Sequence, residues 1–268
     1  MANNRLPGKG ESDEPSMRLA VLIDADNAQA AVIEGLLAEV ARFGEATVKR
    51  VYGDFTSPNS AAWKKVLQTF AIKPVQQFAY TTGKNATDST LIIDAIDLLY
   101  TRKFDAFCLV TSDSDFTGLA IRIREEGLTV LGFGEKKTPA AFIKACNRFI
   151  FTEVLRNTPT AETVKRAPQT KATAKPAKSP APATPAKQTS EFPQKFMLNA
   201  LEQSCDENGW ANLGPFGSYL NKLQPDFDAR NLGFRNLSEL VKAKTDLFVV
   251  EERTPPGSQT KQLFVRAK

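Results

Sequence analysis

The chain has 268 residues and a formal net charge of +5, and its hydrophobic fraction of 42% supports a sizeable core and excludes wholesale disorder. It contains no histidine, which excludes imidazole-based chemistry such as serine triads and histidine-dependent RNA cleavage. The three cysteines, Cys108, Cys146 and Cys205, are too few and too far apart for a zinc knuckle or a disulfide framework. Any bound metal is therefore expected to have oxygen ligands, which favours Mg²⁺ or Mn²⁺.

The excess positive charge is concentrated in one segment. Residues 156–190 carry seven basic residues and one acidic residue and are rich in Ala, Pro and Thr, whereas residues 1–155 and 191–268 are close to neutral. This composition predicts an extended linker. The linker is either a spacer alone or also a basic tether that attracts a phosphate backbone of any sequence. Residues 1–17 are polar and no apolar run reaches membrane-spanning length, so we expect a disordered N-terminus and a cytoplasmic protein without a membrane partner.

Short apolar runs alternate with helical stretches between residues 18 and 155. The expected strands are residues 19–23, 47–52, 72–78, 107–110 and 129–133, with a possible edge strand at 148–154. The expected helices are residues 28–42, 61–70, 89–102, 116–126 and 139–145. Alternation of strand and helix predicts right-handed crossovers and a mostly parallel sheet with helices on both faces. We therefore expect an α/β sandwich over residues 18–155.

Aspartates follow the expected strands at the edge of the sheet where parallel α/β folds place their sites. Asp24 and Asp26 follow the first strand, Asp113 and Asp115 follow the fourth, and Asp88 lies at the start of a helix. If the first and fourth strands are neighbours, Asp24 and Asp113 face each other and Asp88 closes the third side. Carboxylates this close repel one another unless a divalent cation lies between them. Such an ion polarises a phosphodiester and activates water, which indicates hydrolysis.

Each aspartate also has a structural explanation. Helix capping is the favoured explanation for Asp26, whereas capping and metal binding explain Asp88 and Asp115 equally well. Asp24 and Asp113 end strands, and capping explains them less well. The sequence therefore favours a functional role for Asp24 and Asp113 and leaves both explanations open for Asp88 and Asp115.

Four further residues are candidates to support this cluster. Asp94 lies on the expected helix 89–102, where a solvated face is the default and an approach to the cluster is the alternative. Asn27 and Lys84 either contact a phosphate or orient a metal-bound water, or are ordinary polar loop residues. Ser112 precedes Asp113 in the loop after the fourth strand and completes the set.

Three other kinds of site fit the sequence less well. No GxxxxGK[ST] motif is present, which excludes a P-loop NTPase, and no glycine fingerprint follows the first strand, so a dinucleotide fold is unsupported. Asp24-Ala25-Asp26 is similar to the motif of the aspartyl-phosphate phosphatases. However, Asn27 and Ala28 stand where those enzymes usually have a threonine.

The segments LAVLIDADN, GKNATDSTLIIDAIDLL and CLVTSDSDFTGLAIRIREEGLTVLGFG resemble the NYN domain in its LabA-like branch, over roughly residues 18–155. This resemblance implies a PIN-like nuclease fold and a metal-dependent ribonuclease-like activity. It also implies a metal-binding core of Asp24, Asp88 and Asp113, with Asn27 and Asp115 as supports. Ser114 stands where many relatives have glycine, a change that leaves the carboxylates in place.

A second, small domain is expected over residues 191–268. Helices are expected at residues 192–207, 215–223 and 237–244, followed by strands at 247–251 and 262–266. This order is typical of a winged helix-turn-helix, and the phrase GWANLGPFGSYLNKLQPDFDARNLGFRNLSELVKA resembles the OST-HTH (LOTUS) domain, which implies RNA binding. Because the segment has no net charge, RNA binding needs a local patch. The candidates are Arg230, Arg235, Lys242, Lys244 and Lys261.

These observations lead to one main hypothesis and two alternatives. The main hypothesis is a cytoplasmic ribonuclease that hydrolyses single-stranded RNA with Mg²⁺ or Mn²⁺ held by Asp24, Asp88, Asp113 and Asp115, while the C-terminal domain binds RNA. The first alternative is a non-catalytic RNA-binding regulator whose acidic pocket holds a structural metal. The second is an adaptor that binds protein partners through both domains, including the C-terminal domain.

Overall fold

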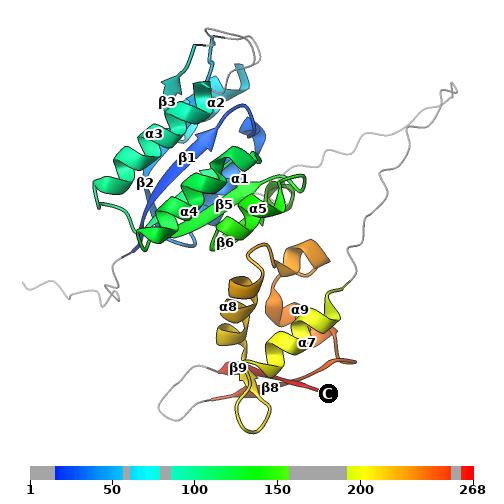
Figure 1. The fold of residues 1–268 in the computed structure, drawn as a ribbon. Coiled ribbons are helices and arrows are strands. Elements are labelled where there is room, and N and C mark those ends of the chain that lie inside the picture. The colour runs from blue at the N-terminus through cyan, green and yellow to red at the C-terminus, as the bar shows by residue number, and fades with distance from the viewer. Residues whose placement is uncertain (1–15, 57–60, 79–85, 157–191, 255–260) are drawn as a thin grey trace, which may run out of the picture. The chain divides into compact units, whose positions relative to one another are not determined.

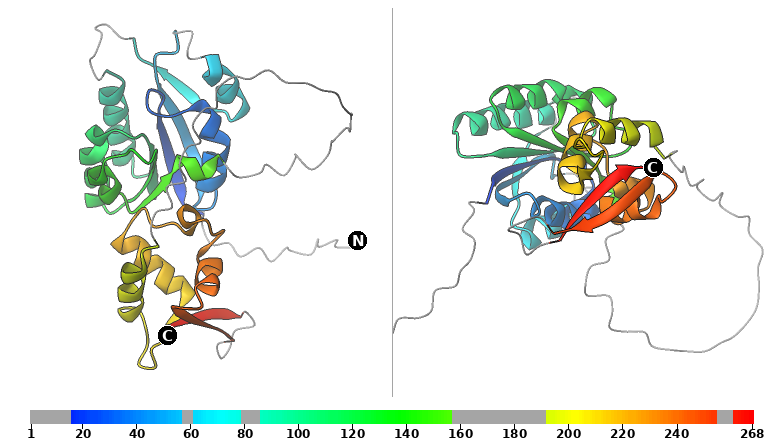
Figure 2. Two further views of the ribbon diagram at one scale, coloured as in Figure 1. Left: turned by 90° about the vertical axis from the view of Figure 1, so that its right-hand side faces the viewer. Right: turned by 90° about the horizontal axis from the view of Figure 1, so that it is seen from below.

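The structure is a computed structural model with two folded parts, seen from three directions in Figures 1 and 2. It describes residues 16–56, 61–78, 86–156, 192–254 and 261–268. Most of the expected N-terminal disordered segment, most of the expected linker and Lys84 lie outside the described residues. Within the described ranges, no helix is both long enough and apolar enough to cross a membrane.

A six-stranded parallel sheet forms the centre of the first part, as the sequence predicts. Its strands are β1 (Arg18–Asp24), β2 (Glu45–Gly53), β3 (Lys73–Gln76), β4 (Ala106–Val110), β5 (Thr129–Gly134) and β6 (Arg148–Phe151), in the order β3-β2-β1-β4-β5-β6. β1 pairs with β4, and Ile23 lies opposite Val110. The first and fourth strands are therefore neighbours, so the residues that follow them lie at the same edge of the sheet.

Helices cover both faces of this sheet. They are η1 (Ala30–Val32), α1 (Ile33–Val40), α2 (Ala61–Thr69), α3 (Ala86–Tyr100), η3 (Ser114–Phe116), α4 (Thr117–Glu125), α5 (Ala140–Ala145) and α6 (Thr152–Leu155). Figure 2 shows α3 and α4 on one face and α1 and α2 on the other. Because both faces are covered, the central strands are apolar throughout, and residues 19–23 and 106–110 are all buried.

The end of the sheet differs from the prediction in one respect. The expected strand 148–154 stops at Phe151, and the chain turns into α6 at Thr152. The carboxylate of Glu153 accepts a hydrogen bond of 3.0 Å from the backbone N–H of Lys136, a contact across 17 residues that periodicity does not reveal. This contact lies just after the end of β6, where the chain changes direction into α6.

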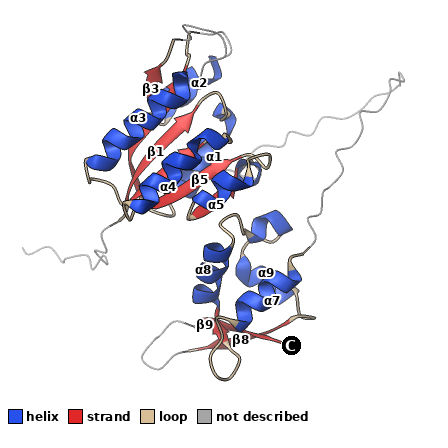
Figure 3. Cartoon of the chain, in the orientation of Figure 1, coloured by secondary structure: helices blue, strands red, loops and turns tan. Residues whose placement is uncertain are grey.

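The second part packs three helices on one side of a small antiparallel sheet (Figure 3). Its elements are α7 (Gln194–Glu202), β7 (Ala211–Asn212), α8 (Leu213–Leu223), η4 (Ala229–Leu232), α9 (Leu237–Ala243), β8 (Phe248–Arg253) and β9 (Gln262–Ala267), and the strand order is β7-β9-β8. The three helices and the hairpin agree with the prediction, whereas β7 and η4 were not predicted. The core includes Met197, Phe216, Leu240, Phe248 and Val265.

Helix α7 ends earlier than the predicted Glu207. The carboxylate of Asp206 accepts hydrogen bonds of 2.9 Å from the backbone N–H groups of Asn208 and Trp210. Gly209 within this turn has φ = +75°, a conformation that glycine adopts without strain. This turn therefore lies between the end of α7 and the start of β7, and it places Trp210 directly before β7.

Candidate metal centre

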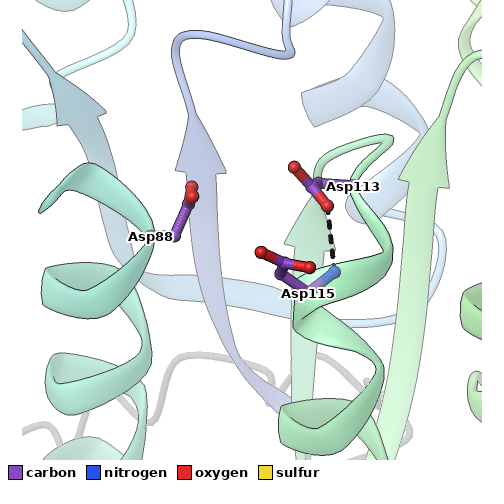
Figure 4. A group of neighbouring side chains, drawn as sticks. All are labelled: Asp88, Asp113 and Asp115. Atoms are coloured by element: carbon purple, nitrogen blue, oxygen red, sulfur yellow. Dashed lines mark hydrogen bonds between the residues drawn. The ribbon is translucent and has the colours of Figure 1, made fainter. Parts of the chain in front are cut away.

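Three carboxylates meet at the carboxyl end of the parallel sheet. Asp88 lies in the first turn of α3, and Asp113 and Asp115 lie in the loop between β4 and α4. Each offers one carboxylate oxygen, and these oxygens lie within 4.8 Å of one another. Figure 4 shows Asp88 facing the loop that carries the other two. Asp88 and Asp113 are half-buried and Asp115 is exposed, so the group is open to solvent on one side.

The loop after β4 is fixed by its own side chains. The Thr111 hydroxyl accepts a hydrogen bond of 3.1 Å from the backbone N–H of Asp113, and the Asp113 carboxylate accepts one of 2.9 Å from the backbone N–H of Asp115. Asp113 is thus the N-cap of η3, and the expectation that capping explains Asp113 less well was wrong. Since a carboxylate has about four acceptor positions, this bond leaves others for a cation.

Ser112 connects this loop to the next strand. Its hydroxyl accepts a hydrogen bond of 2.8 Å from the backbone N–H of Glu135, which directly follows β5. Ser112 and Thr111 are both buried. Through this bond, Ser112 joins the ends of β4 and β5. Its predicted supporting role at the metal site stays a prediction.

Asp24 ends β1 with a fully buried side chain. Its carboxylate accepts hydrogen bonds from the backbone N–H of Asp26 at 3.0 Å and from the side-chain amide of Asn27 at 2.8 Å. Asn27 therefore orients Asp24, and the turn after β1 is closed by Asp24 rather than by the expected cap Asp26. Among the described residues, the group within 4.8 Å consists of Asp88, Asp113 and Asp115 and does not include Asp24.

Asp94 joins α3 to the sheet. Its two carboxylate oxygens accept hydrogen bonds from the Arg50 guanidinium and from the Tyr52 hydroxyl, both on β2. Burial and the bond to Asp94 raise the pKa of Tyr52, so this hydroxyl stays protonated and acts as a donor. The expected solvated position of Asp94 is thus replaced by a half-buried ion pair. This network holds α3 six residues beyond Asp88.

Sequence reasoning missed the role of Arg50 and Tyr52. The signal was present: the two residues are two positions apart on a strand, so their side chains point to the same face of the sheet. Asp94 faces them from α3, 42 residues beyond Tyr52 in the chain. Only knowledge of which helix packs on which face of β2 would have connected the three residues.

In the C-terminal part, three of the five cations predicted for RNA contact have partners within the domain. The guanidinium of Arg230 lies 2.6 Å from the carboxylate of Asp228, and the ammonium of Lys242 lies 3.1 Å from that of Glu252. Lys244 lies 4.7 Å from the centre of the Phe192 ring. The remaining two predicted residues, Arg235 and Lys261, are exposed. The RNA contacts of these five residues stay a prediction.

The donor set at the acidic group fits a hard divalent cation. Its three ligand atoms are all carboxylate oxygens, the type preferred by Mg²⁺ and Mn²⁺. Oxygens bound to one such ion lie about 3 to 5 Å apart, since each metal–oxygen bond measures about 2.0 to 2.6 Å. The observed spacing meets this requirement. Asp88, Asp113 and Asp115 are therefore the residues that would hold the ion.

Three solved structures are similar to parts of this chain. A solution NMR structure of an uncharacterized protein from Nitrosomonas europaea is 61% identical and covers 36% of this chain and 92% of that chain, with a TM-score of 0.29. A crystal structure of a protein of unknown function from Vibrio parahaemolyticus is 18% identical and covers 53% and 96%, with a TM-score of 0.45. A solution NMR structure of a protein from Chromobacterium violaceum is 34% identical and covers 30% and 84%, with a TM-score of 0.24. No curated protein matches.

Family models account for both folded parts. The NYN domain matches residues 18–155, which is more than half of the chain. The OST-HTH/LOTUS domain matches residues 188–259. Both resemblances seen in the sequence are thereby confirmed. With its parallel sheet and the acidic group at the carboxyl end of β4, the chain belongs to the NYN domain family, a family of PIN-like nucleases, and carries a C-terminal OST-HTH/LOTUS domain.

Proposed function

We propose that this protein is a cytoplasmic, Mg²⁺- or Mn²⁺-dependent ribonuclease that hydrolyses phosphodiester bonds of single-stranded RNA. One observation carries the proposal: the carboxylates of Asp88, Asp113 and Asp115 converge within 4.8 Å at the carboxyl end of the central strands. NYN family membership supports it, because this is a family of PIN-like nucleases. The chain has no histidine, so a metal-assisted route is the hydrolytic chemistry that its residues favour.

The roles of the individual residues follow from their environments. Asp88, Asp113 and Asp115 would hold the ion, which when bound would act as a Lewis acid toward the scissile phosphate and would activate water for attack. Asp24, oriented by Asn27, lies at the end of the neighbouring strand, at the same edge of the sheet. Thr111 and Ser112 hold the loop of Asp113 in place. Asp94 fixes α3 and thereby the position of Asp88.

The remaining parts of the chain are assigned to RNA capture. The OST-HTH domain binds RNA, and the segment 156–190, with seven basic residues against one acidic residue, adds attraction to the phosphate backbone. Binding and cleavage therefore reside in different domains. Removal of residues 156–268 leaves cleavage intact and gives weaker, less salt-sensitive RNA affinity.

The decisive experiment is RNA cleavage by the purified full-length protein. A labelled single-stranded RNA is incubated with Mn²⁺, with Mn²⁺ plus EDTA, and with Asp113→Asn and Asp97→Asn variants. Asp97 lies exposed on α3, outside the acidic group, so its variant makes the same change of charge without touching the site. We expect EDTA to abolish cleavage and Asp113→Asn to slow it by at least about a hundredfold.

The Asp97→Asn variant is expected to cleave at the rate of the parent. Equal cleavage by Asp113→Asn and the parent contradicts the proposed site. Tight RNA binding with intact RNA in every sample supports the non-catalytic alternative instead.

A further inference from the structure

The outer face of the C-terminal sheet carries aromatic residues that the core does not use. Side chains of a strand alternate between the two faces, and Phe248, Val265 and Ala211 are buried on the face that packs against the helices. Trp210 and Phe264 are the chain neighbours of Ala211 and Val265 and point to the opposite face. Both are half-buried, and neither belongs to the hydrophobic core of this domain.

Two arginines stack on these rings. The guanidinium carbon of Arg253 lies 4.3 Å from the centre of the Trp210 ring and 5.0 Å from that of Phe264. The guanidinium carbon of Arg266 lies 4.9 Å from the Trp210 ring centre. All three distances lie within the range of about 6 Å over which a cation and an aromatic ring attract each other. The four residues come from β8, β9 and the segment before β7, so strand pairing sets their arrangement.

This face carries two positive side chains and one negative side chain. Arg266 is exposed and forms no ion pair with any described residue, whereas Arg253 lies 2.7 Å from the Glu251 carboxylate. Arg253 and Arg266 together lower the pKa of Glu251, so this group is ionised at neutral pH. The face thus keeps an excess of positive charge. Two amide side chains on the same face, Asn212 and Gln262, form a hydrogen bond with each other.

We propose that this face, defined by Trp210, Phe264, Arg253 and Arg266, is a stacking surface for the bases of single-stranded RNA. Guanidinium groups and aromatic rings both stack on bases, and the excess positive charge complements the RNA backbone. The amides of Asn212 and Gln262 offer donors and acceptors to base edges. Duplex RNA keeps its bases stacked inside the helix, so this surface selects single strands. The inference rests on the proposed RNA-binding role of the C-terminal domain, not on catalysis.

Fluorescence of Trp210 tests the proposal directly. The chain has two tryptophans, so Trp63→Phe leaves Trp210 as the sole emitter. The full-length protein also carries Asp113→Asn, and EDTA is present, so that cleavage does not interfere. The probe is an oligouridine of about 12 nucleotides. We expect quenching of Trp210 that saturates together with the anisotropy of the labelled RNA, and no quenching by a duplex of the same length.

A matched pair of charge variants separates stacking from bulk attraction. Arg266→Gln removes the guanidinium from Trp210, and Lys195→Gln removes an exposed cation from α7. We expect Arg266→Gln to weaken binding of the oligouridine by about fivefold or more and Lys195→Gln by less than about twofold. Trp210→Phe, which keeps a ring, is expected to retain more affinity than Trp210→Ala. Circular dichroism of each variant verifies its fold.

Two results would overturn the inference: RNA binding with unchanged Trp210 emission, or equal affinities for Arg266→Gln and Lys195→Gln. If the parent protein cleaves RNA but Trp210 of the cleavage-deficient variant is not quenched, this inference alone is refuted. If Trp210 is quenched but the parent protein does not cleave RNA, the nuclease proposal alone is refuted.

Discussion

The two sheets of this protein concentrate opposite charges by different geometrical means. The parallel sheet gathers Asp88, Asp113 and Asp115 at its carboxyl edge, because its strands all end on one side. The antiparallel sheet gathers Arg253 and Arg266 on its outer face, because alternate side chains of each strand share a face. Each domain is nearly neutral as a whole. Local topology, and not net charge, therefore decides where an ion or an RNA strand is expected to bind.

The two charged groups also differ in how they are held. Backbone amides and hydroxyls of the adjacent loops fix the aspartates, as the bond from the Asp115 N–H to Asp113 shows. Aromatic rings hold the arginines, as Trp210 does for Arg253 and Arg266. An added ion is therefore expected to stabilise the first group, whereas removal of a ring is expected to disturb the second.

The largest expected effect on stability is that of the metal. A ligand that binds only the folded state stabilises it by about 2.7 kcal/mol when its concentration is a hundred times its dissociation constant. We expect Mn²⁺ to raise the melting temperature of the parent and of Asp97→Asn, but not that of Asp113→Asn. Thermal unfolding at several Mn²⁺ concentrations measures this. An equal rise in all three proteins would show that the ion binds elsewhere.

The next effect concerns the network around Asp94. Asp94→Asn leaves the half-buried Arg50 without its carboxylate, so we expect the free energy of unfolding to fall by about 1 to 3 kcal/mol. We also expect cleavage to slow by about tenfold while RNA affinity stays unchanged, since a displaced α3 moves Asp88. Urea unfolding followed by Trp63 fluorescence in a Trp210→Phe background measures the first quantity.

Asp97→Asn serves again as the control, since Asp97 is exposed on the same helix. Asp94 is a positioning residue if activity and stability both fall and if Mn²⁺ affinity weakens. Unchanged Mn²⁺ affinity and activity in Asp94→Asn would limit its role to stability.

The smallest effect is expected at alkaline pH. Burial raises the pKa of the Cys108 thiol from 9.0 to about 12 and also raises that of the Tyr52 hydroxyl. Above pH 9 the unfolded chain loses these protons while the folded chain keeps them, so stability declines as the pH rises. Below pH 9 neither group contributes to the pH dependence. We expect Tyr52→Phe to decline less steeply than the parent above pH 10 in urea unfolding, and equal slopes would contradict the assignment.

Much of the fold was predictable because its signals are local. The apolar runs of β1 and β4 and the alternation of strand and helix indicate a covered parallel sheet. The turn into α6 and the short strand β7 were missed, because the contact of Glu153 with Lys136 and the pairing of Ala211 with Val265 join distant segments. Such contacts leave no periodic pattern in the sequence.

The sequence predicted an acidic group at this edge of the sheet, but the group of described residues that the structure brings together does not include Asp24. Strand ends placed Asp24, Asp113 and Asp115 at one edge, and the start of a helix placed Asp88 opposite them. The sequence did not show that Asp113 caps η3, because capping depends on backbone angles after the strand. The role of Asp24 and the RNA contacts of the five predicted cations in the C-terminal domain stay predictions.

The central claim is that Asp88, Asp113 and Asp115 together hold one divalent ion. The most direct measurement is an anomalous difference map from a crystal of the full-length protein grown with MnCl₂. A peak between these three carboxylates, within about 2.0 to 2.6 Å of an oxygen of each, is the predicted result. A manganese peak elsewhere, with this position empty, would contradict the account.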